Sequence, residues 1–144
     1  LPAIVEITEK EFAPASIDAG IEAKIGGAPW IRIKAETLEK ELAANPTGCF
    51  VAEMDGAVVG YATNAVNRTA SRGTIANLAV SSACQGRGAG RRLLETSLAY
   101  FRAERLQQAK IETLATNEVG RHLYPSLGFQ EVAQQVHFIM KLEP

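Results

Sequence analysis

Residues 78–90 read LAVSSACQGRGAG, an apolar segment of strand character that leads into a glycine-rich turn. The amphipathic segment at 88–107 predicts a long helix, so the turn precedes a helix N-terminus. The first backbone N–H groups of a helix have no intrahelical partner, and the helix dipole adds positive potential beside them. Glycine lacks a Cβ atom, so an anion can approach these donors closely at Gly86, Gly88 and Gly90. The turn therefore predicts a binding site for a phosphate group.

Three arginines near the turn favour the same interpretation. Arg87, Arg91 and Arg92 place positive charge at the first helical turn, where it opposes the helix dipole. A bound anion gives this arrangement a physical reason, and the alternative is that the glycines serve tight packing. The segment lacks the Lys-Ser/Thr ending of a P-loop, and it follows an antiparallel meander instead of opening a dinucleotide-binding βαβ unit.

The first half of the chain predicts helices followed by a hairpin. Residues 3–8 suggest a short first strand, and residues 9–44 a largely helical region that breaks at the Gly-Gly-Ala-Pro sequence of 26–29. Apolar strands are predicted at 49–54 and 57–67, joined by an Asp-Gly pair that is a strong signal for a two-residue hairpin turn.

The second half predicts a mixed sheet. A third strand at 74–80 completes an antiparallel meander, and a strand at 110–115 follows the long helix, which implies a parallel pair. A short helix at 119–127 and closing strands at 129–133 and 136–142 end the predicted order. The fold class is α+β, with a mixed central sheet flanked by helices.

Length and composition favour one domain over residues 1–144. The chain is 47% hydrophobic, which is enough for a core. Lys and Arg total 15 against 16 Asp and Glu, a net charge of −1, so neither nucleic acid nor a membrane is expected as a partner. Cys49 and Cys84 show no metal-ligand spacing, so no metal is expected, and they fit a reducing, cytoplasmic compartment. Neither a signal peptide nor an apolar run near the roughly 20 residues of a membrane span is found.

Two motifs resemble those of the GNAT superfamily of acetyltransferases. Gln85, Gly88 and Gly90 fill the pattern Gln/Arg-x-x-Gly-x-Gly/Ala of its first motif. Asn117 and the sequence LYPSLGF at 123–129 resemble its second, an Asn followed by Tyr-x-x-x-Gly-Phe. Two motifs in this order and spacing are far more specific than either alone.

The resemblance runs from about residue 49 to the C-terminus and implies acetyl-CoA as co-substrate, with no metal. A core at about 74–129 would bind it, and the helical region at about 9–45 would flank the acceptor. Val80 N–H would polarise the thioester carbonyl, and a bulge in this strand would splay it from 110–115 to open a slot. The cofactor-binding residues so implied are Leu78, Ala79, Val80, Gln85, Gly86, Arg87, Gly88, Ala89, Gly90, Arg91, Asn117 and Tyr124.

Tyr124 is the catalytic residue that the resemblance implies, as the general acid toward the departing CoA thiolate. A tyrosine pKa of about 10 lies above that of a thiol, about 8.5, so proton donation would assist the reaction without being essential. Pro125 stands where relatives often carry Glu, and it should bend the helix or push Tyr124 toward extended geometry. From the residues alone, the alternative is a tyrosine packed beside Leu123 and Leu127.

The sequence does not identify a general base. The strand at 74–80 contains no carboxylate, and Thr74 occupies a position where many relatives place a Glu. An amine acceptor with a pKa of about 10.4 must lose a proton to react at neutral pH. The open candidates are Glu53, Asp55, Glu112, Glu118 and His122.

The acceptor is expected near Trp30 and the loop at 26–29. The resemblance implies direct transfer of the acetyl group to a primary amine, and a small metabolite, an antibiotic, a protein N-terminus or a lysine side chain all stay open. The alternatives to an N-acetyltransferase are a non-catalytic acyl-CoA sensor and a transferase for another acyl group. Exposed strand edges would permit a homodimer.

Overall fold

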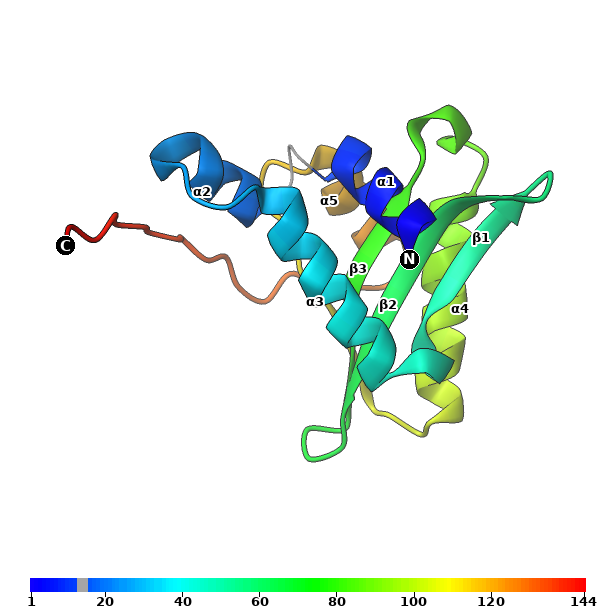
Figure 1. Cartoon of the computed structure of the whole chain (residues 1–144). Helices are drawn as coiled ribbons and strands as arrows, with labels where there is room; N and C mark the ends of the chain where they lie inside the picture. Colours follow the sequence, from blue (N-terminus) through cyan, green and yellow to red (C-terminus); the bar gives the residue numbers. More distant parts are fainter. Residues whose placement is uncertain (13–15) are drawn as a thin grey trace.

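The computed structural model describes residues 1–12 and 16–144. Helices and strands follow one another along the chain as shown in Figure 1. The helices are α1 (Pro2–Glu11), α2 (Ile17–Ile25), α3 (Trp30–Ala44), α4 (Ala89–Ala103) and α5 (Glu118–Ser126). The strands are β1 (Phe50–Met54), β2 (Ala57–Asn67), β3 (Arg72–Val80) and β4 (Gln108–Ile111), and short 3₁₀ turns lie at η2 (Pro46–Gly48) and η3 (Ser82–Cys84).

The strands form one mixed sheet in the order β1-β2-β3-β4. β1, β2 and β3 are antiparallel neighbours, whereas β3 and β4 run parallel. Figure 1 shows α1 and α3 in front of this sheet and α4 behind it. The α+β class and the mixed sheet are confirmed, and so is the break between α2 and α3 at residues 26–29.

Each face of the sheet carries its own apolar cluster. Against α1 and α3 the buried residues are Ile4, Ile7, Leu38, Tyr61 and Ala79, and against α4 they are Ile75, Leu94 and Phe101. The Tyr61 side chain is fully buried, and its hydroxyl lies 2.6 Å from Thr8 Oγ1. Since burial disfavours a phenolate, the pKa of Tyr61 is raised. The tyrosine therefore acts as a neutral core residue that joins α1 to β2.

The expected hairpin between β1 and β2 is present. Asp55 and Gly56 have φ angles of 52° and 79°, the left-handed backbone that a two-residue type I′ turn requires. Glycine adopts this region without a Cβ penalty and aspartate tolerates it.

Residues 3–8 do not form the expected first strand but lie within α1. Ile4, Ile7 and Thr8 are buried, at the i, i+3, i+4 spacing of one helical face, and Pro2 stands in the first turn, where it costs no hydrogen bond. The β-branched isoleucines gave the segment strand character, but burial of the helical face prevails over this propensity.

The closing strands expected at 129–133 and 136–142 are also absent from the structure. Residues 129–144 carry no regular secondary structure, and Figure 1 shows this segment running away from the sheet as an extended tail. A strand needs a partner for its N–H and C=O groups, and the tail pairs with no other described part of the chain.

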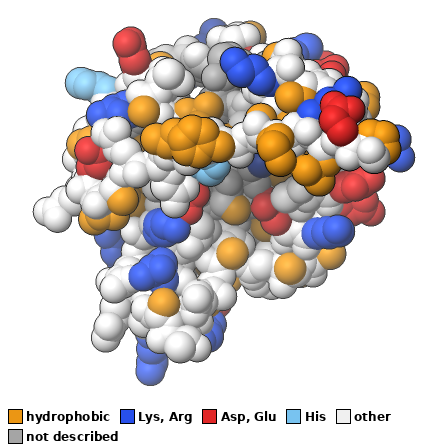
Figure 2. Space-filling model, turned by 90° about the vertical axis from the view of Figure 1, so that its left-hand side faces the viewer, with side chains coloured by type: hydrophobic (Ala, Val, Ile, Leu, Met, Phe, Trp, Pro, Cys, Tyr) orange, Lys and Arg blue, Asp and Glu red, His pale blue; other side chains and the backbone are white. Residues whose placement is uncertain are grey.

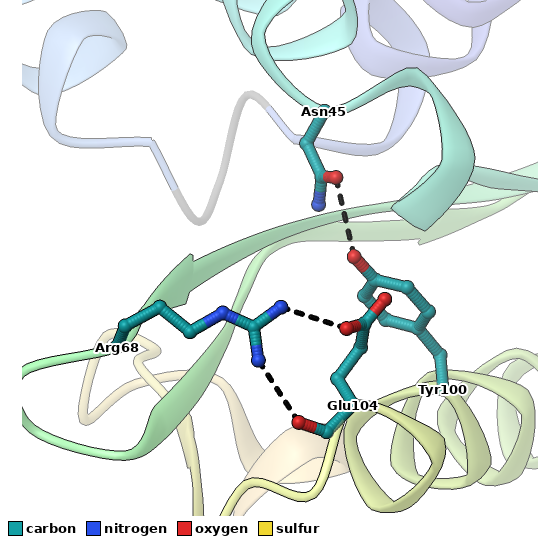
Figure 3. A network of polar contacts seen from close by, with 4 residues as sticks. All are labelled: Asn45, Arg68, Tyr100 and Glu104. Carbon is teal, nitrogen blue, oxygen red and sulfur yellow. Dashed lines mark hydrogen bonds and ion pairs between the residues drawn. The ribbon is translucent and has the colours of Figure 1, made fainter.

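Two sets of hydrogen bonds hold the C-terminal end of α4 in place (Figure 3). Arg68, in the β2–β3 turn, donates to the carbonyl oxygen of Glu104 at 2.9 Å and to its carboxylate at 2.7 Å. Tyr100 Oη donates to Asn45 Oδ1 at 3.2 Å, which ties α4 to the end of α3. The exposed ion pair contributes little energy on its own, but the contacts together fix the register of α4 against the sheet.

We expect Gly73→Ala to destabilise the fold. A Cβ atom at Gly73 would overlap the ring of Phe101, which is buried and held between β3 and α4. Overpacking of this kind costs about 2–3 kcal/mol, which lowers Tm by roughly 10 °C in a domain of this size.

Thermal unfolding of Gly73→Ala beside Gly20→Ala provides the measurement. Gly20 lies inside α2, and a Cβ atom there meets nothing within 4 Å, so alanine should leave Tm equal or higher. Equal Tm values for Gly73→Ala and the wild type would contradict the packing of Phe101 described here.

Candidate functional site

A bulge in β3 coincides with the end of its pairing to β4. Thr63 pairs with Asn77 and Asn64 with Ile75, so Ala76 is the extra residue of β3. Pairing to β4 ends at Ile75 with Ile111. Beyond this point, residues 76–80 have no strand partner on that edge within the described chain. The bulge implied by the family resemblance is thus confirmed, and the pairing of β3 to β4 ends beside it, where β4 itself ends.

The glycine-rich turn follows β3 directly. After η3, Gly86 and Gly88 both adopt left-handed backbone, with φ angles of 82° and 81°, and Gly88 is the N-cap residue of α4. A Cβ atom at either position would meet no protein atom within 4 Å, and one at Gly90 only Val80 Cγ2 at 3.7 Å. Tight packing against protein atoms therefore does not explain these glycines, whereas the backbone conformation explains two of them. Left-handed residues in such a turn gather backbone N–H groups into a concavity that suits an anion.

Unpaired donors and cations converge at this turn. The first helical bond of α4 runs from Arg92 N–H to Gly88 O at 3.0 Å, so the N–H groups of Ala89, Gly90 and Arg91 have no intrahelical acceptor. Arg91 donates to Ser126 Oγ of α5 at 2.9 Å, and Arg87 lies 3.3 Å from Met54 Sδ. Within residues 1–12 and 16–144, no carboxylate forms an ion pair with Arg87, Arg91 or Arg92. The charges of these three arginines are therefore not compensated by an ion pair in that part of the chain.

Glu11, at the end of α1, holds the start of the turn. Its carboxylate accepts from Ser82 N–H at 2.8 Å and lies 3.4 Å from Gln85 Nε2. The same Gln85 amide donates to Val80 O at 3.3 Å, across the turn. This role of Glu11 was not predicted from the sequence, because the contact joins residues more than 70 positions apart.

Tyr124 lies on α5, with its ring 6.2 Å from that of Phe129. The side chain is half-buried, and burial raises the pKa of its hydroxyl. A Cβ atom at Gly120 would approach the ring to 2.9 Å, so glycine at that position leaves room for Tyr124. The extended geometry that Pro125 was expected to favour at Tyr124 is not observed. Helix α5 runs through both residues to Ser126, and Pro125 stands only one residue from its end.

Asn117 has a structural role that the sequence did not reveal. Its side-chain oxygen accepts from Gly120 N–H at 3.2 Å, as an N-cap of α5, and its amide donates to Thr113 Oγ1 at 2.8 Å. Asn117 therefore holds the start of the helix that carries Tyr124.

The candidate bases from the sequence are not brought together. All five are exposed, and none forms a hydrogen bond with Tyr124 in the described chain: Glu53, Asp55, Glu112, Glu118 and His122. Glu112, directly after β4, forms an ion pair with Lys110 at 2.6 Å.

Instead, α3 supplies a carboxylate to β3. Glu41 accepts hydrogen bonds from Asn77, beside the bulge, and from Thr63 at 3.1 Å. Lys34, two turns earlier on α3, donates to the same Asn77 side chain, and burial lowers the pKa of Lys34. Glu41 was not among the candidates from the sequence, although two signals were present. Residues 34 and 41 lie on the same face of a helix, and Asn77 is a polar residue within the apolar strand β3. We call Lys34, Glu41, Thr63 and Asn77 the α3–β3 polar cluster.

Trp30 begins α3 and is partly exposed. Its backbone N–H donates to Glu22 Oε2 of α2 at 2.7 Å, which closes the loop at 26–29. The side chain is thus not sealed in the core.

The model of the acetyltransferase (GNAT) family matches residues 3–129. The chain belongs to this family. As a GNAT protein it shares 34% identity over 108 residues with a mycothiol acetyltransferase of Acidothermus cellulolyticus, over 65% of this chain and 33% of the relative. It shares 33% identity over 87 residues with an uncharacterised N-acetyltransferase of Methanocaldococcus jannaschii, over 60% of this chain and 54% of the relative. The chain therefore spans a third to about half of the length of these relatives.

Solved structures of other proteins share the fold of this chain. The PaiA N-acetyltransferase of Thermoplasma acidophilum in complex with coenzyme A superposes with a TM-score of 0.75, at 17% identity, over 93% of this chain and 86% of that one. In the described part of this GNAT chain, no helix combines the length and apolar character needed to cross a membrane.

Proposed function

We propose that the chain transfers an acetyl group from acetyl-CoA directly to a primary amine. One observation carries this proposal, the glycine-rich turn with left-handed Gly86 and Gly88 beside the unpaired edge of β3. The turn offers donors and cations to a pyrophosphate, and the edge of β3 offers backbone groups to the amide-bearing arm of the cofactor.

The residues present fit such a cofactor. Backbone N–H groups at 86–91 and the side chains of Arg87 and Arg91 would hold the phosphates, with Gln85 positioned by Glu11 to shape the turn. The ends of the unpaired strand, Leu78, Ala79 and Val80, would bind the pantetheine arm, and Asn117 and Tyr124 would close the site from α5.

The transfer forms one bond and breaks one. The neutral amine nitrogen attacks the thioester carbonyl carbon, and charge builds on the carbonyl oxygen, where Val80 N–H would stabilise it. The C–S bond then breaks, the CoA thiolate takes a proton from the Tyr124 hydroxyl, and the proton that the acylated nitrogen loses returns to the Tyr124 oxygen. The raised pKa of Tyr124 keeps that proton in place at neutral pH.

We assign Glu41 as the general base. It takes the proton that the acceptor ammonium must lose before the neutral amine can attack. Support comes from its place in the α3–β3 polar cluster, at the bulge where β3 leaves β4. The cluster also lies on the face of the sheet covered by α1 and α3, the face expected to border the acceptor.

We expect Glu41→Gln to lower kcat/KM for the amine at pH 7 by about a hundredfold, the lower end of the effect of a general base. Glutamine can still accept from Asn77, so the fold should stand. The deficit should shrink as pH rises toward the pKa of the amine, about 10, because the neutral amine then forms without a base. Glu36→Gln, on the exposed side of α3, is the matched control and should leave the pH profile unchanged. A pH-independent deficit in Glu41→Gln would assign the residue a structural role only.

The proposed function is tested by release of free CoA thiol from acetyl-CoA in the presence of an amine panel. The panel should include an aminoglycoside, a diamine, a lysine-containing peptide and a peptide with a free N-terminus. Turnover with any member, stoichiometric with N-acetylated product by mass spectrometry, supports the proposal. Binding of acetyl-CoA without turnover across the panel favours the sensor, and turnover with propionyl- or succinyl-CoA alone favours another acyl donor.

A further inference from the structure

Lys34 is a half-buried cation whose charge has no ion-pair partner in the part of the chain that the structure describes. Its ammonium donates one hydrogen bond there, to the side-chain oxygen of Asn77, although an ammonium carries three N–H donors. Burial lowers the pKa of Lys34, against the opposite effect of the negative charges of Glu41 and Asp18. Because a cation removed from water is unfavourable unless its charge is compensated, this arrangement favours an anionic ligand at Lys34.

A carboxylate stands at the other end of the same amide group. The side-chain oxygen of Asn77 accepts from Lys34, and its side-chain nitrogen donates to Glu41. The oxygen and nitrogen of an amide are bonded to the same carbon atom, so the ammonium of Lys34 and the carboxylate of Glu41 lie close together. They do not form an ion pair with each other. The α3–β3 polar cluster therefore presents a cation and an anion side by side.

The zwitterion of a free amino acid has the complementary arrangement of charge. Its carboxylate and its ammonium are bonded to the same carbon atom, so the carboxylate can accept from Lys34 while the ammonium donates to Glu41. That ammonium is the group from which Glu41 takes a proton in the proposed reaction. A diamine or a lysine side chain would instead bring further positive charge toward Lys34, which costs energy.

Aromatic side chains lie close to this pair of charges. The ring centroid of Phe12 is 5.5 Å from Lys34 Nζ, and Trp30 precedes Lys34 by one turn on the same face of α3. Aromatic neighbours reduce access of water to an ion pair and strengthen it. Lys34 and Glu41 both stay partly exposed, so a small solute can reach them. Figure 2 shows the side on which α2 lies in Figure 1, where charged side chains flank a hollow below a row of hydrophobic ones.

We propose that the acceptor is a free amino acid, whose carboxylate binds Lys34 while its amine is held by Glu41. This inference rests on the proposed transfer to a primary amine and names the class of that amine. The bond changes are the same: the N–C bond forms, the C–S bond breaks, Glu41 takes the proton of the ammonium, and CoA leaves as the thiol. Lys34 binds the acceptor and takes no proton.

The first test measures binding without turnover. The protein is saturated with CoA, which carries no acetyl group, and is titrated with each of the common amino acids and with its carboxamide. At least one amino acid should bind about tenfold more tightly than its carboxamide, the lower end of the effect of a hydrogen bond to a charged group. Lys34→Met, which removes the charge and keeps the length, should bind both equally. Lys40→Met, on the exposed side of α3, is the matched control and should keep the preference. Equal binding of every acid and its amide by the wild type, or a preference that survives in Lys34→Met, overturns the inference.

The second test measures turnover of the same pairs. The carboxylate of an amino acid raises the pKa of the adjacent amine, so the carboxamide has more neutral amine at pH 7 and is intrinsically the more reactive acceptor. A higher kcat/KM for the amino acid therefore reports recognition of the carboxylate. Lys34→Met should lower kcat/KM for the amino acid about tenfold through KM and leave the carboxamide unchanged, with the circular dichroism spectrum and acetyl-CoA affinity of the wild type.

The outcomes separate this inference from the proposed function. Turnover of carboxamides or diamines in preference to every amino acid overturns the inference and leaves the proposed function standing. Absence of turnover with every amine contradicts the proposed function instead, and the binding preference then decides alone whether the site recognises amino acids.

Discussion

Gly88→Glu is expected to abolish measurable binding of acetyl-CoA, with Kd raised more than a hundredfold. Gly88 has a φ angle of 81°, where a residue with a Cβ atom costs about 1–2 kcal/mol. A carboxylate about 4 Å from a bound phosphate adds repulsion on the order of 4 kcal/mol near a protein surface. A hundredfold change in Kd needs only about 2.7 kcal/mol, so the two effects together exceed it.

Isothermal titration with acetyl-CoA measures the effect, and two controls separate its causes. Gly88→Ala carries the backbone cost without the charge, and it should weaken binding about tenfold. Gly20→Glu adds the same charge on α2, where a Cβ atom meets nothing within 4 Å, and it should bind like the wild type. Wild-type affinity in Gly88→Glu would show that the turn does not hold the cofactor, and the proposed function would lose its central support.

The parts of the molecule that the sequence predicted correctly depend on local backbone chemistry. The β1–β2 turn needs left-handed residues, which Asp55 and Gly56 supply, and the turn before α4 needs glycine at 86 and 88. Such requirements are met within a few residues, so they can be read from the sequence without knowledge of distant contacts. The boundaries of β2 at 57–67 were predicted correctly for the same reason.

The parts that the sequence did not predict depend on contacts between distant segments. Residues 3–8 have strand propensity and helical spacing at once, and only burial against Tyr61 and Leu38 favours the helix. Glu41 is one of several acids in the sequence of α3, and its contact with β3 depends on the position of Asn77 in the folded sheet. Residues 136–142 have a strand pattern, but a pattern alone does not supply the partner strand that pairing requires, and the described chain has none for this segment.

Tyr124→Phe is expected to lower kcat by about ten- to a hundredfold while Kd for acetyl-CoA stays unchanged. General acids contribute roughly a hundredfold or more, but a thiolate with a pKa of about 8.5 leaves readily without help, which places this effect at the low end. Phenylalanine keeps the contact with Phe129 and the space beside Gly120, so the loss reports on the hydroxyl. Steady-state kinetics gives kcat, and titration gives Kd.

The pH dependence decides whether the hydroxyl acts as an acid. Burial raises the pKa of Tyr124 above its ordinary value of about 10, which favours the neutral phenol, so the wild type should show no alkaline decline from this group below that pH. Tyr100→Phe is the matched control, because it removes the hydroxyl bonded to Asn45 and should leave kcat unchanged. Equal kcat values for Tyr124→Phe and the wild type would contradict the assigned role. A wild-type decline near pH 9 that the variant lacks would instead contradict the raised pKa of Tyr124, because it would mean that the group loses its proton at a pH where its buried environment should retain it.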